Sequence, residues 1–160
     1  MQREKEFIGI IKANEGLIYK VTKIYSLSKE DGQDLYQEIV YQLWKSFSSF
    51  RNESKISTWI YRISLNTSIA HLNKEKRKGN QVPIDQLPLN ITDISDTVMD
   101  ERSEVLFNLI KKLNNIEKGI ILLYLEGKTH AEIASITGFT TTNVGTRLGR
   151  IKQKIISQIN

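Results

Sequence analysis

Apolar residues recur at helical spacing over residues 34–47, and this pattern constrains the fold more than any other feature of the chain. A helix returns to the same side every three or four residues, so the pattern predicts an amphipathic helix with one buried face. The apolar stripe consists of Leu35, Tyr36, Ile39, Val40, Leu43, Trp44 and Phe47. The polar side consists of Asp34, Gln37, Glu38, Gln42 and Lys45.

A second helix is predicted after the break in periodicity at residues 50–54, with Ser54 as a candidate N-cap. Its predicted buried stripe is Ile56, Ile60, Ile63, Thr67 and Ala70. Its predicted exposed flank is Lys55, Trp59, Arg62, Asn66 and Asn73, and its basic end is Lys74, Lys76, Arg77 and Lys78. An aromatic, an arginine and amides on one face suit a polyanion that offers bases to stack on. The pattern leaves a second interpretation open, in which the tryptophan belongs to the core and the basic end is only solvated.

The residues before this pair of helices carry no evident chemistry. Residues 4–25 have apolar positions at four-residue steps, which predicts one or two amphipathic helices interrupted or bent near Gly16. Ser28, with Asp31 three residues later, resembles a capping box that starts the helix carrying Leu35. We expect these segments to pack on the two central helices and close a small bundle.

Both prolines and four aspartates fall within residues 79–100, where helical periodicity is lost. Proline is excluded from helix interiors and biases the preceding residue toward extended conformations, so this segment is predicted to be a flexible linker. A linker does not hold carboxylates at a fixed separation, which argues against paired-carboxylate catalysis. Basic segments lie on either side, at residues 71–80 and 128–160. This segregation of charge suggests two nucleic-acid contacts and a spacer.

Two further helices are predicted at residues 101–113 and 116–125, the second ended by Gly127. Residues 129–132 then fit a capping box that opens a short helix, residues 137–139 form a tight turn, and Thr140 can cap the next helix. In that last helix the predicted buried stripe is Val144, Leu148, Ile151 and Ile155. A polar row lies one position earlier: Asn143, Arg147, Arg150 and Lys154.

A short helix, a glycine turn and a longer basic helix together predict a helix-turn-helix, whose second helix enters the major groove of DNA. A plain helical hairpin is the alternative, but it does not require a row of donors beside the core stripe. DNA binding is therefore the favoured interpretation of this segment.

Composition excludes several other classes of protein. The 160 residues include no cysteine, which removes disulfides and thiolate metal sites. The longest apolar run, residues 120–125, is too short to span a bilayer, and the first ten residues lack the apolar block of a signal peptide. His71 and His130 lack metal-binding spacing and are predicted to be surface or capping-region residues. We therefore expect a cytoplasmic protein that is not an enzyme and has no metal, cofactor, small-molecule substrate or membrane insertion.

The first half of the chain resembles region two of bacterial RNA polymerase sigma factors, most closely those of the small extracytoplasmic-function (ECF) class. The matching residues are Asp34-Leu35, Gln37-Glu38, Trp44, Phe50-Arg51, Thr58-Trp59-Ile60-Tyr61-Arg62-Ile63 and Asn66. Residues 102–155 resemble region four on Glu126-Gly127, Glu132-Ile133-Ala134, Gly138, Val144, Arg147-Leu148 and Arg150. Gly145 and Gly149 depart from that pattern, where the family often has a cation and a larger polar or aromatic residue. This departure affects which promoter bases the helix would read, and it leaves the helix-turn-helix motif itself intact.

The resemblance implies an all-α fold with two small helical domains, residues 1–78 and 101–160, joined by a linker at residues 79–100. It implies a subunit that directs core RNA polymerase to specific promoters and melts them for initiation. The first domain would bind the polymerase clamp and the minus-ten element, and the second would bind the minus-thirty-five element. The linker would thread toward the active-centre cleft. Expected partners are core RNA polymerase (clamp and flap), promoter DNA and an anti-sigma factor.

The resemblance also implies candidate residues for each of these contacts. The clamp is expected to bind Asp34, Gln37, Glu38 and Gln42. The unpaired minus-ten strand is expected to bind Arg51, Asn52, Lys55, Trp59, Arg62 and Asn66, with Trp59 as the wedge or stacking surface. Duplex phosphates are expected to bind Lys74, Lys76, Arg77 and Lys78. The helix-turn-helix is expected to bind DNA through Thr142, Asn143, Thr146, Arg147, Arg150 and Lys154.

Two alternative functions make different predictions. A stand-alone helix-turn-helix transcriptional regulator would bind its operator tightly as the purified protein. An interaction module that captures another sigma factor would bind polymerase without supporting promoter-specific transcription, and it would leave the row containing Trp59 and Asn66 unexplained.

Overall fold

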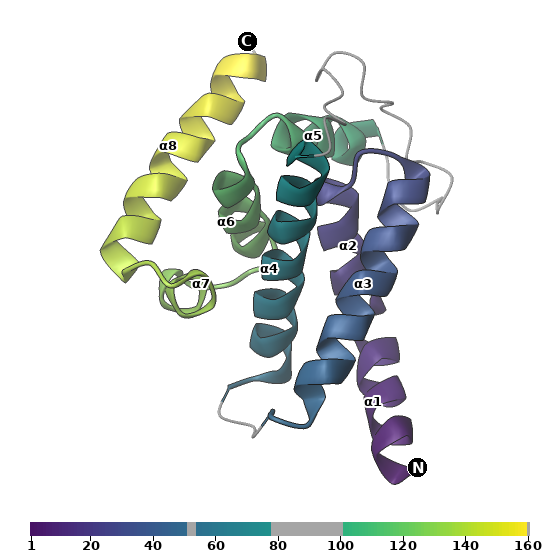
Figure 1. Cartoon of the computed structure of the whole chain (residues 1–160). Coiled ribbons are helices and arrows are strands. Elements are labelled where there is room, and N and C mark those ends of the chain that lie inside the picture. The colour runs from purple at the N-terminus through teal and green to yellow at the C-terminus, as the bar shows by residue number, and fades with distance from the viewer. Residues whose placement is uncertain (51–53, 78–100, 160) are drawn as a thin grey trace. The chain divides into compact units, whose positions relative to one another are not determined.

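The computed structural model describes residues 1–50, 54–77 and 101–159, and all regular secondary structure in these residues is α-helical (Figure 1). Contacts between Cα atoms divide the chain into two compact units, Met1–Val82 and Pro83–Asn160. The predicted all-α fold class with two helical domains is confirmed. The linker predicted at residues 79–100 lies outside the described residues.

Four helices build the first unit: α1 (Gln2–Ala13), α2 (Glu15–Tyr25), α3 (Lys29–Phe47) and α4 (Ile56–Arg77). Helices α2, α3 and α4 pack against one another, and α1 packs on α3 (Figure 1). The centre of this bundle consists of fully buried Ile18, Val21, Ile24, Leu35, Ile39, Leu43 and Ile60. Burial of these branched side chains supplies most of the free energy that holds the helices together.

The interruption expected near Gly16 lies at Asn14. Its side-chain amide donates to the Ile10 carbonyl at 2.8 Å, and its backbone N–H bonds the Ile11 carbonyl at 3.0 Å. A short amide side chain competes with the regular backbone bonds of a helix, which favours an ending here. Helix α2 begins at the next residue.

Helix α3 begins with the predicted cap and buries part of its predicted stripe. The Ser28 hydroxyl accepts from the Asp31 N–H at 3.1 Å, while the Asp31 carboxylate accepts from the Leu27 N–H at 2.8 Å. The reciprocal bond therefore reaches one residue further back than in a standard capping box. Trp44 was also expected in the stripe, but its side chain is 40% exposed.

Helix α4 was predicted with the wrong face buried. It begins at Ile56, and the Lys55 carbonyl accepts the Trp59 N–H at 3.1 Å, so Ser54 is not its N-cap. The buried residues are Thr58, Trp59, Ile60, Tyr61, Ser64, Leu65, Ser68 and Leu72. Of the expected stripe Ile56, Ile60, Ile63, Thr67 and Ala70, only Ile60 is fully buried. The isoleucines suggested one face, but the helix buries a face that contains two serines.

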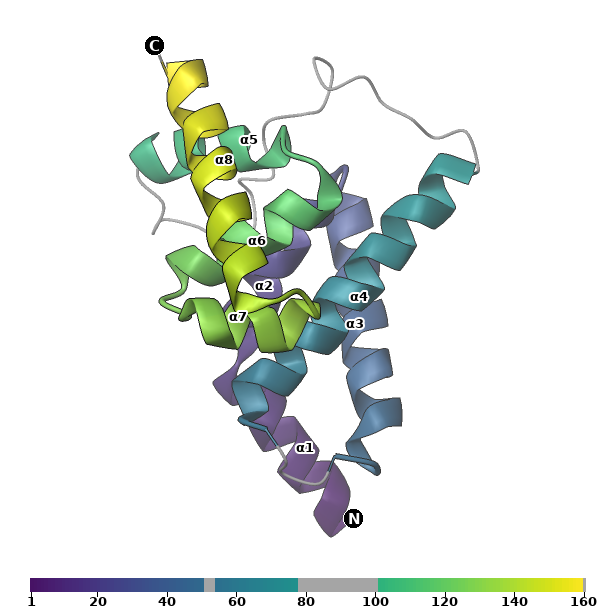
Figure 2. The same ribbon diagram turned by 90° about the vertical axis from the view of Figure 1, so that its left-hand side faces the viewer.

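The second unit consists of α5 (Glu101–Lys111), α6 (Asn115–Leu125), α7 (His130–Thr137) and α8 (Thr141–Ile159). Helices α6, α7 and α8 pack mutually, and α5 contacts α6 and α8. Figures 1 and 2 together show that α7 crosses α8 at a steep angle. The core consists of Ile110, Ile120, Leu123, Ile133, Val144, Leu148 and Ile151.

The end of α6 confirms the stop predicted at Gly127. This glycine has a positive φ of 85°, which a side chain at that position would disfavour. Its N–H bonds the Tyr124 carbonyl at 3.0 Å, and the Lys128 N–H bonds the Leu123 carbonyl at 3.1 Å. These two bonds form a Schellman motif, which satisfies the last carbonyls of the helix.

Candidate nucleic-acid interface

Local hydrogen bonds fix the helix-turn-helix at both ends of its first helix. The Thr129 hydroxyl accepts from the Glu132 N–H at 3.1 Å, and the Glu132 carboxylate accepts from the Thr129 N–H at 3.0 Å. Gly138 ends α7 with a φ of 89° and bonds the Ala134 carbonyl at 2.8 Å. The capping box and the glycine turn that the sequence predicted are both confirmed.

Helix α8 has the two faces that its periodicity predicted. The Thr140 hydroxyl caps it by accepting the Asn143 N–H at 3.1 Å. Val144, Leu148 and Ile151 are buried against the rest of the unit, and Ile155 is half-buried. On the polar side Thr142, Thr146 and Arg150 are exposed, whereas Asn143 and Arg147 are half-buried. A core face and an exposed polar face on one helix are what major-groove recognition requires.

Arg147 is held by two neighbours. Its Nε donates to the Asn143 side-chain oxygen at 2.7 Å, and its guanidinium carbon lies 4.2 Å from the centroid of the Phe139 ring. Phe139 belongs to the turn between α7 and α8 and is half-buried. Sequence reasoning missed Phe139, because a residue in the turn belongs to neither helical row.

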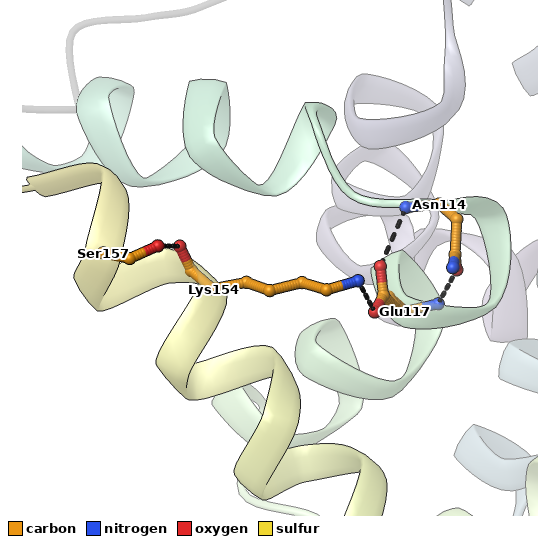
Figure 3. A network of polar contacts seen from close by, with 4 residues as sticks. All are labelled: Asn114, Glu117, Lys154 and Ser157. Atoms are coloured by element: carbon orange, nitrogen blue, oxygen red, sulfur yellow. Dashed lines mark hydrogen bonds and ion pairs between the residues drawn. The ribbon is translucent and has the colours of Figure 1, made fainter.

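Lys154, which was predicted in the polar row of α8, forms an ion pair within the second unit. Its ammonium lies 2.5 Å from Glu117 Oε2 on α6 (Figure 3). The other oxygen of Glu117 accepts from the Asn114 N–H at 3.1 Å, and Asn114 Oδ1 accepts from the Glu117 N–H at 2.8 Å, which caps α6. Lys154 therefore pairs with a capping carboxylate of its own unit, although its side chain is 54% exposed.

His130 and Gly145 lie together where α7 and α8 meet. His130 is exposed and follows the capping residue of α7, which confirms its predicted place in a capping region. A Cβ added at Gly145 would lie 3.5 Å from His130 Nδ1, an ordinary contact distance. Gly149 has no heavy atom within 4 Å of such a Cβ. Helix α8 therefore has no side chain at Gly145 or Gly149, and the ring of His130 lies beside Gly145.

A polar groove between α3 and α4 joins residues that were predicted for different partners. Its volume is about 560 Å³, and it is lined by Asp34, Glu38, Gln42, Asn66, Thr67, Ala70, His71 and Lys74. Gln42 donates to Glu38 Oε1 at 3.0 Å. His71 Nε2 lies 2.6 Å from Asp31 Oδ1, with both side chains largely buried. Of the two places predicted for His71, surface or capping region, the second applies, because Asp31 belongs to the cap of α3. The acids predicted to face the clamp and two of the residues predicted to face DNA therefore share one surface.

An apolar groove between α1 and α3 contains the outer part of the stripe predicted for α3. Its volume is about 590 Å³, and it is lined by Glu4, Phe7, Ile8, Tyr36, Gln37, Val40, Tyr41 and Trp44. Phe7 and Trp44 meet edge to face with centroids 5.0 Å apart. Burial, and secondarily the charge of Glu15, raises the pKa of the Tyr36 phenol above its usual value. An exposed apolar surface of this kind is typical of a protein-binding site.

Trp59 lies in the core of the first unit, which contradicts its predicted place on the exposed flank of α4. It is 7% exposed, its ring stacks on Phe50 with centroids 4.7 Å apart, and Phe47 lies at 6.2 Å. The structure agrees with the alternative interpretation, in which the tryptophan is a core residue. Lys55 and Asn66 are exposed as expected, and Arg62 is half-buried.

The basic end of α4 is exposed at Lys74, Lys76 and Arg77. Arg51, Asn52 and Lys78, which were also predicted to contact DNA, lie outside the described residues. Within the described ranges no group of three or more histidine, cysteine, aspartate or glutamate residues could hold a metal ion. No helix among these same residues is long and apolar enough to cross a membrane.

Two helical units, the second of them a helix-turn-helix with an exposed polar recognition face, define a class of DNA-binding protein. The sequence pattern described as Sigma-70 region 2 matches residues 10–78, and the pattern described as Sigma-70, region 4 matches residues 103–155. The two matches together span most of the chain, which therefore belongs to the sigma-70 family, in its ECF class. The predicted resemblance and the function as a sigma factor that directs RNA polymerase are confirmed.

Individual relatives agree with this assignment. The chain is 28% identical over 145 residues to the ECF RNA polymerase sigma-E factor of Haemophilus influenzae, covering 83% of this chain and 77% of that protein. It is 25% identical over 155 residues to the sigma-E factor of Escherichia coli K12, covering 88% and 81%.

Solved structures share the fold. The sigma factor RpoE of Bartonella quintana, crystallised with the anti-sigma factor NepR, matches with a TM-score of 0.72 at 16% identity, covering 98% of this chain and 95% of that one. CnrH, in complex with the cytosolic domain of CnrY, matches with a TM-score of 0.70 at 15% identity, covering 98% and 88%.

Proposed function

We propose that this ECF sigma factor binds core RNA polymerase through its first unit, opens the minus-ten element there, and holds the minus-thirty-five element with its helix-turn-helix. The observation that carries the proposal is the division of α8 into a buried face at Val144 and Leu148 and an exposed polar face at Thr142, Thr146 and Arg150. The steep crossing of α7 under this helix supports insertion of α8 into the major groove.

The polymerase contact is assigned to the acidic side of α3. Asp34, Gln37 and Glu38 are exposed there, and Gln42 is tied to Glu38. Charged residues on a rigid, well-capped helix can select a basic partner surface and accelerate its association. This factor would act in the cytoplasm with polymerase and DNA, and it would carry out no catalysis of its own.

The DNA contacts divide between the two units. In the first unit Lys55, Arg62 and Asn66 would approach the unpaired strand, together with Arg51 and Asn52. The cations Lys74, Lys76, Arg77 and Lys78 would bind duplex phosphates, which position the protein without reading sequence. In the second unit the set is Thr142, Asn143, Thr146, Arg147 and Arg150. Lys154 is left out because its charge is taken up by Glu117.

Trp59 can serve as a stacking surface only after Phe50 has left its ring, because the two rings are stacked in this structure. We propose that promoter opening includes this exposure. Stacking of an unpaired base on the indole would then offset the loss of the aromatic contact, since base stacking contributes about 1–3 kcal/mol.

An anti-sigma factor is a further proposed partner, supported by two solved relatives, one crystallised with the anti-sigma factor NepR and one in complex with the cytosolic domain of CnrY. The apolar groove between α1 and α3 supports this proposal, because it exposes Tyr41 and Trp44 to a protein ligand.

In vitro transcription with core enzyme and a promoter library tests the main proposal. The expected result is transcription from a defined subset of promoters that depends on this protein. Tight operator binding by the protein alone, without promoter-dependent transcripts, would support a stand-alone regulator instead. Polymerase binding with no specific transcription would support an interaction module.

A further inference from the structure

Two contacts within the second unit orient the side chain of Arg147. Its Nε donates to the side-chain oxygen of Asn143, one turn earlier on α8, and its guanidinium carbon lies over the Phe139 ring, 4.2 Å from the centroid. A cation over an aromatic face is attracted by the ring quadrupole, and arginine stacks flat in this position. Among the described residues, the side chain of Arg147 makes no other hydrogen bond. The two terminal nitrogens therefore keep their N–H groups for a ligand.

An arginine fixed in this way has lost rotamer freedom that a solvated arginine would lose only on binding. Preorganisation of this kind raises affinity by lowering the entropy cost of association. The same two contacts also restrict the plane of the guanidinium group. Geometry therefore favours a planar target with two adjacent acceptors in one plane. Guanine offers such a pair, O6 and N7, at its major-groove edge.

We propose that Phe139 and Asn143 are positioning residues that hold Arg147 to read one guanine in the upstream promoter element. The inference rests on the proposed DNA-binding function of α8. Arg147 lies in the N-terminal half of the recognition helix, the part that contacts base edges when such a helix enters the major groove. Phe139 thus sets base selectivity from the turn, without touching DNA.

The test measures binding of holoenzyme to duplexes carrying a promoter selected from the library, using Phe139→Leu, Phe139→Tyr, Arg147→Ala and the double variant Phe139→Leu with Arg147→Ala. Each duplex is also made with 7-deazaguanine at each guanine of the upstream element in turn, which removes only the N7 acceptor. Arg147→Ala should weaken binding about 5- to 150-fold and abolish the effect of one 7-deazaguanine. Phe139→Leu should weaken binding about two- to fivefold, and Phe139→Tyr, which keeps the ring, should not.

The double variant separates positioning from a purely structural role. Phe139→Leu should have no further effect when Arg147 is already alanine, because its contribution acts through the guanidinium. If Phe139→Leu weakens binding equally in both backgrounds, the ring is only structural and the inference is overturned. If Arg147→Ala weakens all sequences equally and no 7-deazaguanine matters, Arg147 binds phosphate and the guanine assignment is overturned. If Arg147→Ala has no effect at all, the proposed DNA-facing side of α8 fails as well.

Discussion

Removing the charge of Lys154 should destabilise the second unit and leave promoter binding intact, although this lysine lies on the same helix as the DNA-facing residues. The ammonium is paired with Glu117, which itself caps α6 (Figure 3). Lys154→Met keeps most of the apolar stem and removes only the charge. Arg150→Met is the matched control, because Arg150 is exposed and lies one turn earlier.

The size of the effect follows from the exposure of the two partners. An exposed ion pair contributes about 0.2–1 kcal/mol, whereas breaking a buried pair costs about 3–5 kcal/mol. The Lys154 side chain is 54% exposed and that of Glu117 is 12% exposed, so solvent screens one partner and not the other. The first turn of α6 and the Asn114 N–H continue to stabilise the carboxylate. We expect a loss of about 1–2 kcal/mol, between the two limits.

Hydrogen exchange on the full-length protein is the suitable assay, because a chain with two units does not unfold in one transition. Peptides from α6 and α8 report opening of the second unit. In Lys154→Met their slowest amides should exchange about 5- to 30-fold faster, which corresponds to the expected loss of free energy. Peptides from α3 and α4 should be unchanged, and so should holoenzyme binding to promoter DNA.

Arg150→Met should give the opposite result, with unchanged exchange and weaker promoter binding. If Arg150 contacts a phosphate, the slope of log affinity against log salt should also fall by about 1. If Lys154→Met left exchange unchanged and weakened promoter binding as Arg150→Met does, the ion pair with Glu117 would carry no stability. Lys154 would then return to the DNA-facing row.

Three other tests address the assignments of single faces. Leu148→Ala should cost about 2–5 kcal/mol because Leu148 is fully buried, and Ile156→Ala, at an exposed position on the same helix, should cost less than about 0.5 kcal/mol; equal exchange rates in the two variants would contradict this. Trp59→Ala should cost about 3–5 kcal/mol in the first unit, and unchanged protection of α4 would show that the ring is not packed. Asp34→Lys with Glu38→Lys should weaken pull-down of core polymerase while α3 keeps its helical content, and undiminished capture would refute the clamp assignment.

The sequence predicted the second unit closely because its signals are local. The Thr129–Glu132 capping box, the glycine at the end of α7 and the Thr140 cap each depend on residues at most four positions apart. The stripe of α8 is apolar and regular, so its period alone separates the core face from the polar face. Contacts between helices have no such signature. Glu117 and Lys154 are 37 positions apart, and nothing in the period of either helix indicates that they meet.

Helix α4 shows why periodicity fails where polar residues are buried. Ser64 and Ser68 are fully buried, and their hydroxyls have no hydrogen-bond partner among the described residues. Side chains this small let α4 approach α2 and α3 closely, although a hydrophobicity pattern counts them as surface. Ile56, at the start of the helix, is instead partly exposed. The prediction assigned the isoleucines to the buried face of the helix, and this assignment placed Trp59 on the exposed face.

The polar groove between α3 and α4 has a consequence for experiments on either of its walls. Asp34 and Glu38 line it together with Asn66 and Lys74, so reversing the two acids also changes the potential around residues proposed to face DNA. The two effects have opposite signs: added positive charge repels a basic polymerase surface and attracts nucleic acid. Gln37→Lys adds a charge to the same exposed side of α3 but outside this groove, since Gln37 lines the apolar one. Glu38→Gln changes the charge by the same single unit inside the groove, so it should raise nonspecific affinity for single-stranded DNA more than Gln37→Lys does, even as it lowers polymerase capture. If both affinities fell together, the groove would be one continuous binding surface whose contacts to polymerase and DNA cannot be assigned to separate residues.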